Sequence, residues 1–429
     1  MRETVAVAAA TEEVLPERIQ EVLGQLVGAA KEGLLALSVG VGLGVLAELM
    51  AEEVEVVVGP VGRHDAQRVA VRHGTTVGEV TLGGRRLPVE RPQVRTADRG
   101  AEVPLGTYTH FASRDPLTAL VLERILAGGS MRGYRRQQEP VGAGVERVSR
   151  ATSKSAVSRM FVARTRSALS ELMGRRLDDV RLAAMMLDGI DLGERTHVVA
   201  LGITTQAVKI PLGLWEGSTE NTTIVRTLLA DLVARGLDPE QGILFVIDGG
   251  KALRRAIRDV FGEAPVQRCV RHKERNVTDH LPERERPGVR SRLRAAWAEA
   301  DHARAEQRLS QLAIELERTY PDAAGSLREG LDETLTVTAL GLHPQLRRTL
   351  QSTNPCESMI EIVRHVQRNV KRWQPGDMAL RWTAAGMLEA ERKFRRVVGY
   401  EHLAALVTAI EHHHEPSTTT KEAATLVPA

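Results

Sequence analysis

The chain has 429 residues, of which 42% are hydrophobic and 26% are charged, a balance typical of globular domains that argues against a disordered or fibrous protein. A chain of this length has room for two to four domains and at least one sizeable core. Aromatic residues make up only 3%, so stacking of bases on aromatic side chains is not expected to dominate any binding of nucleic acid.

The charge is nearly balanced, with 58 basic and 55 acidic residues and a net charge of +3. Only eight of the basic residues are lysine, and the rest are arginine. Arginine binds phosphate groups and guanine edges better than lysine does, but a GC-rich coding sequence would produce the same excess. Both explanations stay open, and local clusters of basic residues are more informative than the total.

The cysteine count and the N-terminus indicate a protein of the reducing cytoplasm. Cys269 and Cys356 are the two cysteines, too few for a disulfide framework. The N-terminus carries acidic residues instead of a basic start followed by an apolar run, so no secretory signal is expected. Residues 34–47 are apolar and glycine-rich but shorter than the roughly 20 residues of a membrane span, and they predict a buried helix.

The first part of the chain predicts helices followed by short strands. Residues 1–60 alternate charged and apolar patches in a helical pattern. Two β-prone pieces, at 75–82 and 86–89, lie between Gly-Gly and proline breaks, and a helical pattern returns at 116–127. We assign residues 1–110 to one N-terminal region.

A helix is predicted from Ser153, which can act as its N-cap, to about Leu172. Short polar and basic side chains at the start of a capped helix suit a recognition helix in the DNA major groove; here they are Lys154, Ser155, Ser158 and Arg159. An ordinary amphipathic surface helix would give the same pattern. Residues 111–180 are therefore predicted to be a helix-turn-helix-like DNA-binding region.

Residues 181–281 predict a mixed α/β layer. Strands are expected at 182–187, 196–203, 207–214 and 243–247, and helices at 221–234 and 251–261. A loop at 191–195 would join the first two strands. Antiparallel strands followed by strand–helix alternation favour an α/β fold with helices flanking a mixed sheet.

The remainder of the chain predicts helices. Residues 282–350 are rich in Arg, Glu and Ala, contain no convincing strand and look like an all-helical insertion. Helices at 357–367 and 378–394 fall within residues 351–415, which we assign to the end of the same core. The tail, 416–429, is expected to be disordered.

Three carboxylates are candidates for phosphodiester chemistry, which two divalent metal ions can support. Asp188 and Asp248 each follow an apolar strand and precede a glycine, and Glu357 begins a helix. Mg²⁺ prefers such oxygen ligands. Each residue also has a simpler interpretation, because an aspartate after a strand often forms a turn and a glutamate in a first helical turn is favoured by the helix dipole.

Five segments, in order, carry a resemblance to a known family. They are 187–190 (Leu-Asp-Gly-Ile), 212–221 (Leu-Gly-Leu-Trp-Glu-Gly-Ser-Thr-Glu-Asn), 235–237 (Arg-Gly-Leu) with 246–257, 266–277 (Val-Gln-Arg-Cys-Val-Arg-His-Lys-Glu-Arg-Asn-Val) and 354–358 (Asn-Pro-Cys-Glu-Ser). In this order the segments resemble the Mutator-type transposases of bacterial insertion sequences. The resemblance covers roughly residues 146–400, and the N-terminal part more loosely.

The resemblance implies a ribonuclease-H-like core in which Asp188, Asp248 and Glu357 are catalytic and bind Mg²⁺ or Mn²⁺, with two ions expected. It also implies a helical insertion between the second aspartate and the glutamate. Such a transposase would bind the terminal inverted repeats of its element, cut DNA and join strands, as at least a dimer on DNA, associated with the nucleoid and not with a membrane. Two alternatives stay open: a non-catalytic DNA-binding protein derived from a transposase, and a structure-specific nuclease on the same core.

Cys269 and His272 match the family's Cys-x-x-His signature, for which we expect a structural role or a place near the DNA path. A zinc site is the alternative, but it needs four protein ligands, with Cys356, His343 or His280 to complete it. Two basic clusters are candidate phosphate contacts or solvated surfaces. They comprise Arg268, Arg271, His272, Lys273 and Arg275, and then Arg364, His365, Arg368, Lys371 and Arg372. Trp215 and Trp373 are candidates for wedging against DNA or for core packing.

Overall fold

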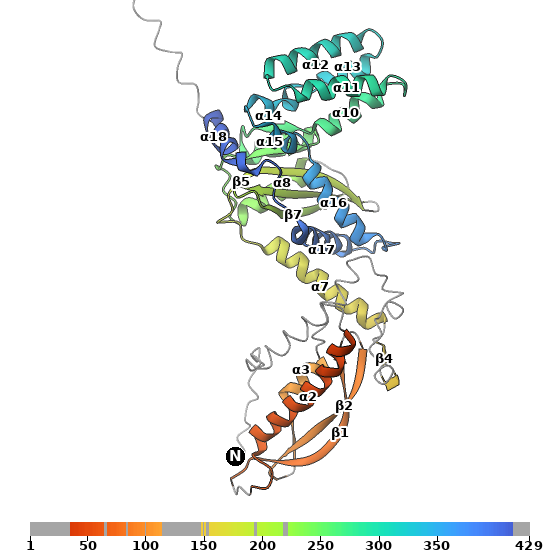
Figure 1. Cartoon of the computed structure of the whole chain (residues 1–429), viewed down its shortest axis with the longest axis vertical. Coiled ribbons are helices and arrows are strands. Elements are labelled where there is room, and N and C mark those ends of the chain that lie inside the picture. The colour runs from red at the N-terminus through yellow and green to blue at the C-terminus, as the bar shows by residue number, and fades with distance from the viewer. Residues whose placement is uncertain are drawn as a thin grey trace, which may run out of the picture. The chain divides into compact units, whose positions relative to one another are not determined.

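The computed structural model describes residues 35–63, 67–82, 85–98, 100–113, 147–148, 150–151, 154–192, 195–217 and 222–414. Several predictions therefore lie outside the described residues: the helical pattern before residue 35, the helix at 116–127, the cap at Ser153 and the tail at 416–429. The chain divides into two compact units, Met1–Val162 and Ala163–Ala429, and each is described by itself (Figure 1).

The first unit packs helices against a small antiparallel sheet. Its elements are α2 (Leu35–Val58), β1 (Ala70–Leu82), β2 (Arg85–Thr96), β3 (Glu102–Val103), α3 (Gly106–Ser113) and β4 (Arg150–Ala151). Strand β2 pairs with β1, β3 and β4, so the two predicted β-prone pieces belong to one longer hairpin. Helix α2 buries Val39, Leu46, Met50 and Val54 on one face, but Val41 is 50% exposed. The helix predicted for residues 34–47 is therefore confirmed in its described part, whereas the predicted burial holds for one face alone.

The second unit contains a five-stranded mixed sheet, which confirms the α/β class. Its strands are β5 (Leu182–Leu192), β6 (Arg195–Thr204), β7 (Lys209–Gly217), β8 (Leu244–Ile247) and β9 (Val266–Arg268), in the order β7-β6-β5-β8-β9. Strands β5, β6 and β7 are antiparallel neighbours, whereas β8 runs parallel to both β5 and β9. Helices α8 (Thr222–Ala234) and α9 (Lys251–Phe261) contribute apolar faces to the core on this sheet.

The prediction that the first of these strands ends at residue 187 was wrong. Strand β5 continues to Leu192, and its last pairs with β6 are Asp191 with Thr196 and Leu192 with Arg195. The polar sequence after Leu187 suggested a strand end, but hydrogen bonds across the hairpin override that local signal. The strand therefore carries Asp188 inside the ladder, and residues 191, 192 and 195 of the predicted loop belong to strands β5 and β6.

Residues 282–350 are helical wherever they form regular structure. The helices are α11 (Arg286–Ala298), α12 (His302–Glu317), α13 (Pro321–Arg328), the 3-10 turn η1 (Asp332–Thr334), α14 (Thr336–Ala339) and α15 (Pro344–Leu350). They follow α10 (Val270–Asp279) and share with it an apolar core that includes Val277, Leu293, Trp297 and Leu309. Helices α11, α12 and α13 lie together as a bundle (Figure 1).

The remaining helices of the second unit are α16 (Asn354–Gln367), α17 (Met378–Lys393), the turn η2 (Tyr400–His402) and α18 (Leu403–His414). Helices α16 and α17 pack closely at Gly386, where a Cβ atom would come within 2.9 Å of the Val363 Cα. Helix α7 (Lys154–Gly174) is joined to α17 by Arg381, which donates to the Thr165 hydroxyl at 2.8 Å. Arg175, just after α7, makes a bidentate pair with Glu391 at 2.7 and 2.9 Å.

None of the helices within the described residues combines the length and the apolar character that crossing a bilayer requires.

Candidate active site

Asp188 and Asp248 lie next to each other because the strands that carry them are neighbours. Strands β5 and β8 pair in parallel, with Ala184 opposite Leu244 and Met186 opposite Val246. The register offset is 60 positions, the same as the separation of the two aspartates in the sequence. Asp188 is 8% exposed within β5, and Asp248 is half-buried directly after β8.

A main-chain amide just after each aspartate holds its carboxylate. The Gly189 amide donates to Asp188 Oδ1 at 2.9 Å, and the Gly250 amide donates to Asp248 Oδ1 at 2.8 Å. Gly249, between Asp248 and Gly250, has a φ of 102°, a backbone conformation that residues with a side chain rarely adopt. A Cβ atom there would also clash with Arg268. The position after Asp248 therefore excludes any residue with a side chain.

Glu357 reaches the same place from the first turn of α16. Its side chain is 43% exposed, and its Oε1 accepts a hydrogen bond of 3.0 Å from the Thr353 hydroxyl. The three predicted carboxylates line one cavity of about 780 Å³ together with His272, Arg275 and Arg364. The fold thus brings together three residues that the sequence pattern singled out, from β5, from the end of β8 and from α16. Asp188 and Asp248 are 60 positions apart in the sequence, and Asp248 and Glu357 are 109 apart.

Burial and neighbouring charges shape the protonation of this cavity. Burial raises the pKa of Asp188 to about 6; the charge of His272 opposes this rise, while the carboxylates of Asp248 and Glu357 add to it. The pKa of His272 is raised to about 9, first by its hydrogen bond with Cys269 and also by the nearby carboxylates. At neutral pH the cavity therefore contains a protonated histidine beside the acidic residues.

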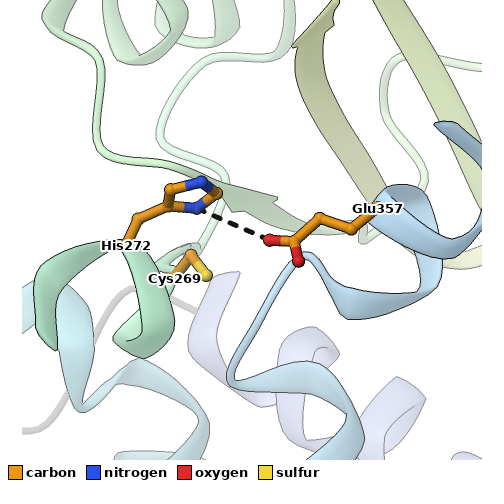
Figure 2. A group of neighbouring side chains, drawn as sticks. All are labelled: Cys269, His272 and Glu357. Atoms are coloured by element: carbon orange, nitrogen blue, oxygen red, sulfur yellow. Dashed lines mark ion pairs between the residues drawn. The ribbon is translucent and has the colours of Figure 1, made fainter. Parts of the chain in front are cut away.

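Cys269, His272 and Glu357 are drawn together around Thr353. His272 Nδ1 lies 3.8 Å from Glu357 Oε1, and Figure 2 shows the imidazole of α10 facing this carboxylate of α16. The buried Cys269 thiol accepts from the Thr353 amide at 3.4 Å. Burial alone would raise the pKa of Cys269, but hydrogen bonds from His272 and Thr353 outweigh it and lower the pKa.

The donor atoms of the cavity fit hard divalent cations. Three carboxylates from separate segments provide the oxygen ligands that Mg²⁺ and Mn²⁺ prefer, and burial next to two further carboxylates raises the pKa of Asp188. Within the described residues, the only three ligand side chains whose atoms lie within 4.8 Å of one another are Cys269, His272 and Glu357.

The predicted zinc alternative lacks its remaining ligands. Cys269, His272 and Glu357 could supply three, but Cys356, His343 and His280 are not part of the group. Cys356 is fully buried, and burial raises its pKa well above the usual value, which disfavours a metal-binding thiolate. The structure thus favours a hydrogen-bonding role for Cys269 and His272.

Two of the predicted phosphate contacts point into the protein. Lys273 is 0% exposed, and its ammonium donates to the carbonyls of Ser326 and Glu329 at the C-terminal end of α13. Arg268 is 6% exposed and donates to the same Glu329 carbonyl at 2.8 Å. Their charge suggested contact with DNA, but their burial prevents such contact. Lys273 and Arg268 are therefore excluded as phosphate contacts.

The other basic candidates remain accessible. Arg275 and Arg364 line the carboxylate cavity itself, whereas Arg271 lies outside it. The remaining members of the second cluster, His365, Arg368, Lys371 and Arg372, are exposed on or just beyond α16. On α7, Ser155 and Arg159 are exposed and Ser158 is half-buried, while Lys154 belongs to the same first turn. These four lie in the first unit.

The tryptophans and one buried histidine complete the surroundings. Trp215 is partly buried against the core of the sheet, in favour of packing, and Trp373 is half-buried. Sequence reasoning missed His197, which is fully buried on β6 with Nε2 3.0 Å from Glu216 Oε2. Burial lowers its pKa to about 4. The only sequence signal was the polar residue at the start of an apolar strand.

Comparison with known proteins identifies the family. The model of the Mutator family of transposases matches residues 37–396. A probable transposase for an insertion sequence element of Corynebacterium diphtheriae is 27% identical over 245 residues, which cover 54% of this chain and 70% of the relative. The transposase for insertion sequence element ISRM5 of Rhizobium meliloti is 24% identical over 358 residues, covering 83% and 88%.

A third relative, the transposase for insertion sequence element IS6120 of Mycolicibacterium smegmatis, is 27% identical over 232 residues, covering 52% of this chain and 70% of its own length. The family match includes all three carboxylates, both cavity-lining arginines and the helical segment between Asp248 and Glu357. The resemblance inferred from the sequence motifs is confirmed. The chain belongs to the Mutator family of transposases.

Proposed function

We propose that this chain binds the terminal inverted repeats of an insertion sequence and catalyses metal-dependent cleavage and transfer of DNA strands. The observation that carries the proposal is the convergence of Asp188, Asp248 and Glu357 on one cavity in a chain of a transposase family. We also propose that the five-stranded sheet is a ribonuclease-H-like core. Its three antiparallel strands followed by two parallel ones support this assignment.

Asp188, Asp248 and Glu357 would hold two Mg²⁺ or Mn²⁺ ions. When bound, such ions lower the pKa of a water or hydroxyl nucleophile and neutralise charge on the leaving oxygen. The residues of the chain do the positioning. Main-chain amides fix one oxygen of each aspartate, the Thr353 hydroxyl fixes Glu357, and Arg275 and Arg364 face the same cavity, where they can bind the phosphate.

The reaction would take place in two displacements at phosphorus. In the first, a water oxygen bonds to phosphorus, the bond to the 3′ oxygen breaks, and the water proton passes to solvent or a basic group. In the second, the freed 3′-hydroxyl bonds to a phosphorus of another strand and displaces its 3′ oxygen. Because two element ends must meet for this, at least a dimer is expected on DNA.

Recognition of the element ends is assigned to the first unit and α7. The exposed Ser155 and Arg159 lie in the first turns of α7, a position from which side chains can reach base edges. We propose that residues 111–180 form the DNA-binding region, with residues 1–110 in support.

The test uses a labelled duplex that carries one end of the element and its flank. Purified protein should nick it at the repeat boundary with Mg²⁺ and not with a chelator, and then form joined products. Asp248→Asn should abolish both while binding persists, whereas Asp259→Asn, an exposed aspartate on α9, should cut normally. Cleavage by the Asp248→Asn protein would refute the assignment.

Two other functions predict different products. A silenced transposase acting as a DNA-binding regulator would bind the end duplex and give no product with any metal. A structure-specific nuclease on the same core would cut branched DNA without terminal repeats and would not join strands. The three carboxylates favour an active enzyme over the regulator.

A further inference from the structure

A second cavity of about 780 Å³ lies beside the candidate active site, within the second unit. Its walls come from the start of β7, from α10, α11 and α15, from the first turns of α16 and from residues 396–398. We call it the basic cleft. It lies between the sheet that carries the aspartates and the helical segment 282–350, and Arg271 is its one member among the basic residues singled out from the sequence.

The charged side chains of the basic cleft are predominantly cationic. The basic ones are Lys209, Arg271, Arg294, Arg348 and Arg396. The one acidic residue that lines the cleft is Glu274, and it is already paired: Arg294 makes a bidentate pair with it at 2.6 and 2.7 Å, and Arg290 approaches it at 3.7 Å. The excess positive charge is therefore not neutralised from within.

Most of the cations are available to a ligand. Among the described residues, no carboxylate lies within ion-pair distance of Arg271 or Arg348, and both are exposed. Lys209 and Arg396 lie over the rings of Phe394 and Tyr400, at 5.0 and 5.2 Å. An aromatic ring orients a cation without cancelling its charge, so these two remain attractive to anions.

The basic cleft adjoins the carboxylate cavity. Asn354 and Ser358 line both, so the first turns of α16 form the wall that the two cavities share. Helix α10 contributes neighbouring residues to opposite sides: Arg271 lines the basic cleft and His272 lines the carboxylate cavity. A polyanion held at the carboxylates would reach the cleft by passing over the first turns of α16.

We propose that the basic cleft binds the sugar–phosphate backbone of the DNA strand that leads away from the phosphate in the carboxylate cavity. The proposal rests on the proposed function, because it takes the carboxylate cavity as the place of cleavage. Arg271 would contact the phosphates nearest that point, and Arg348 and Arg396 those farther along. Such contacts are independent of base sequence and hold the strand in register.

The test compares two double variants of equal charge change. Arg348→Ala with Arg396→Ala removes two cations of the cleft. The control, Arg304→Ala with Arg318→Ala, removes one exposed arginine in α12 and one directly after it, and among the described residues neither lies within ion-pair distance of a carboxylate. Both are made in the Asp248→Asn protein, and binding of the labelled end duplex is followed by fluorescence anisotropy over a range of salt concentrations.

The slope of log K against log salt is negative, and each phosphate contact adds about 0.9 to its magnitude. We expect the cleft variant, which lacks two contacts, to reduce that magnitude by about 1.8. The control should leave the slope unchanged. Equal slopes for the two variants would overturn the proposal. Thermal unfolding of both proteins, with coincident midpoints, shows that any difference does not come from misfolding.

A second measurement uses the cleft substitutions in the cleavage-competent protein. Loss of a contact made equally in the ground state and the transition state raises KM and leaves kcat unchanged, and this is the expected result; an unchanged KM would contradict the proposal. Failure of the two proposals can be distinguished. A protein that never cuts but whose slope falls in the cleft variant refutes the proposed function and retains the cleft. A protein that cuts normally with an unchanged slope refutes the cleft alone.

Discussion

Two cavities of about the same volume, about 780 Å³ each, lie on either side of the first turns of α16 and differ in how their charges are held. In the carboxylate cavity, Asp188 is inside a strand, and main-chain amides bond both aspartates. In the basic cleft, Arg348 and Arg396 are exposed side chains on a helix and a loop. The backbone thus fixes the first set of charges, whereas flexible side chains present the second.

The two cavities should therefore differ in how many charged side chains each can lose by substitution. A charge that must lie at one point relative to a reacting atom needs a rigid support, and a strand in the middle of a sheet provides it. Charges that contact successive groups of a polymer backbone each contribute a part of the binding free energy, so the loss of one charge weakens binding only in part. We therefore expect the carboxylate cavity to fail after one substitution and the basic cleft to weaken in proportion to the number removed.

The largest effect is expected for Glu357→Gln, which keeps the size of the side chain and removes its charge. Cleavage of the end duplex should fall by at least about 10²–10³-fold, the usual cost of losing one group that stabilises charge in the transition state. Glu411→Gln, on the exposed surface of α18, is the control and should cut at the wild-type rate. A loss of less than tenfold for Glu357→Gln would erase the contrast between the two cavities.

The next effect concerns α10, which separates the cavities. Lys273→Met should destabilise the protein by about 1–3 kcal/mol, the usual cost of a carbonyl left without its donor, because the Ser326 carbonyl loses the Lys273 ammonium, whereas the Glu329 carbonyl keeps its hydrogen bond from Arg268. Urea unfolding gives the value. Lys393→Met, which removes an exposed ion pair with Glu389, should change the stability by less than about 1 kcal/mol. If the two variants are equally stable, Lys273 does not anchor α10.

Protonation of Asp188 should appear in the stability of the metal-free protein. Burial raises its pKa from 3.8 to about 6, so the folded state holds this proton more tightly than the unfolded state does. The resulting stabilisation is complete below pH 4 and is lost as the pH rises through 6, by up to about 3 kcal/mol. Asp188→Asn should abolish this loss in thermal unfolding scans with a chelator. His272 also stabilises the folded state, and this stabilisation is lost at higher pH, between its usual pKa of 6.5 and its raised value of about 9. That second loss of stability should remain in the Asp188→Asn protein.

The smallest effect is expected at Thr353, which orients Glu357 without touching the DNA in our proposal. Thr353→Val removes the hydrogen bond of 3.0 Å to Glu357, worth about 1 kcal/mol, and should slow cleavage several-fold. Thr353→Ser keeps the hydroxyl and should restore the rate. If valine and serine behave alike, the hydrogen bond does not contribute to the position of the carboxylate.

The sequence was sufficient for features with a local pattern. The apolar run before Asp248 and the spacing within α9 predicted β8 and its following helix to within one residue. The register between β5 and β8 was not visible, because parallel pairing depends on residues far apart in the chain. The pairing of β5 with β6 beyond Leu187 was not visible either, so Asp188 was placed after a strand and not within it.

Charge misled the sequence analysis where burial decided the outcome. Arg268, Lys273 and Arg275 are equally basic in the sequence, but the first two bond to carbonyls in the interior and the third faces a cavity. Arg348 and Arg396, in contrast, were overlooked because each lies in a separate short basic run and the two line one cavity only in the folded chain. Residue type predicted the chemistry of the site, and the packing of distant helices determined which cations take part.

The bonds from Arg268 and Lys273 to the end of α13 also determine what can be removed from this protein. If residues 282–350 were deleted, the two cations would remain in the interior of β9 and α10 without the acceptors that now satisfy them, beside the glycine that follows Asp248. The helical insertion is therefore not a separable module. A minimal catalytic fragment has to retain it, and a shortened one would lose the shape of its aspartate turn before it lost any residue of the triad.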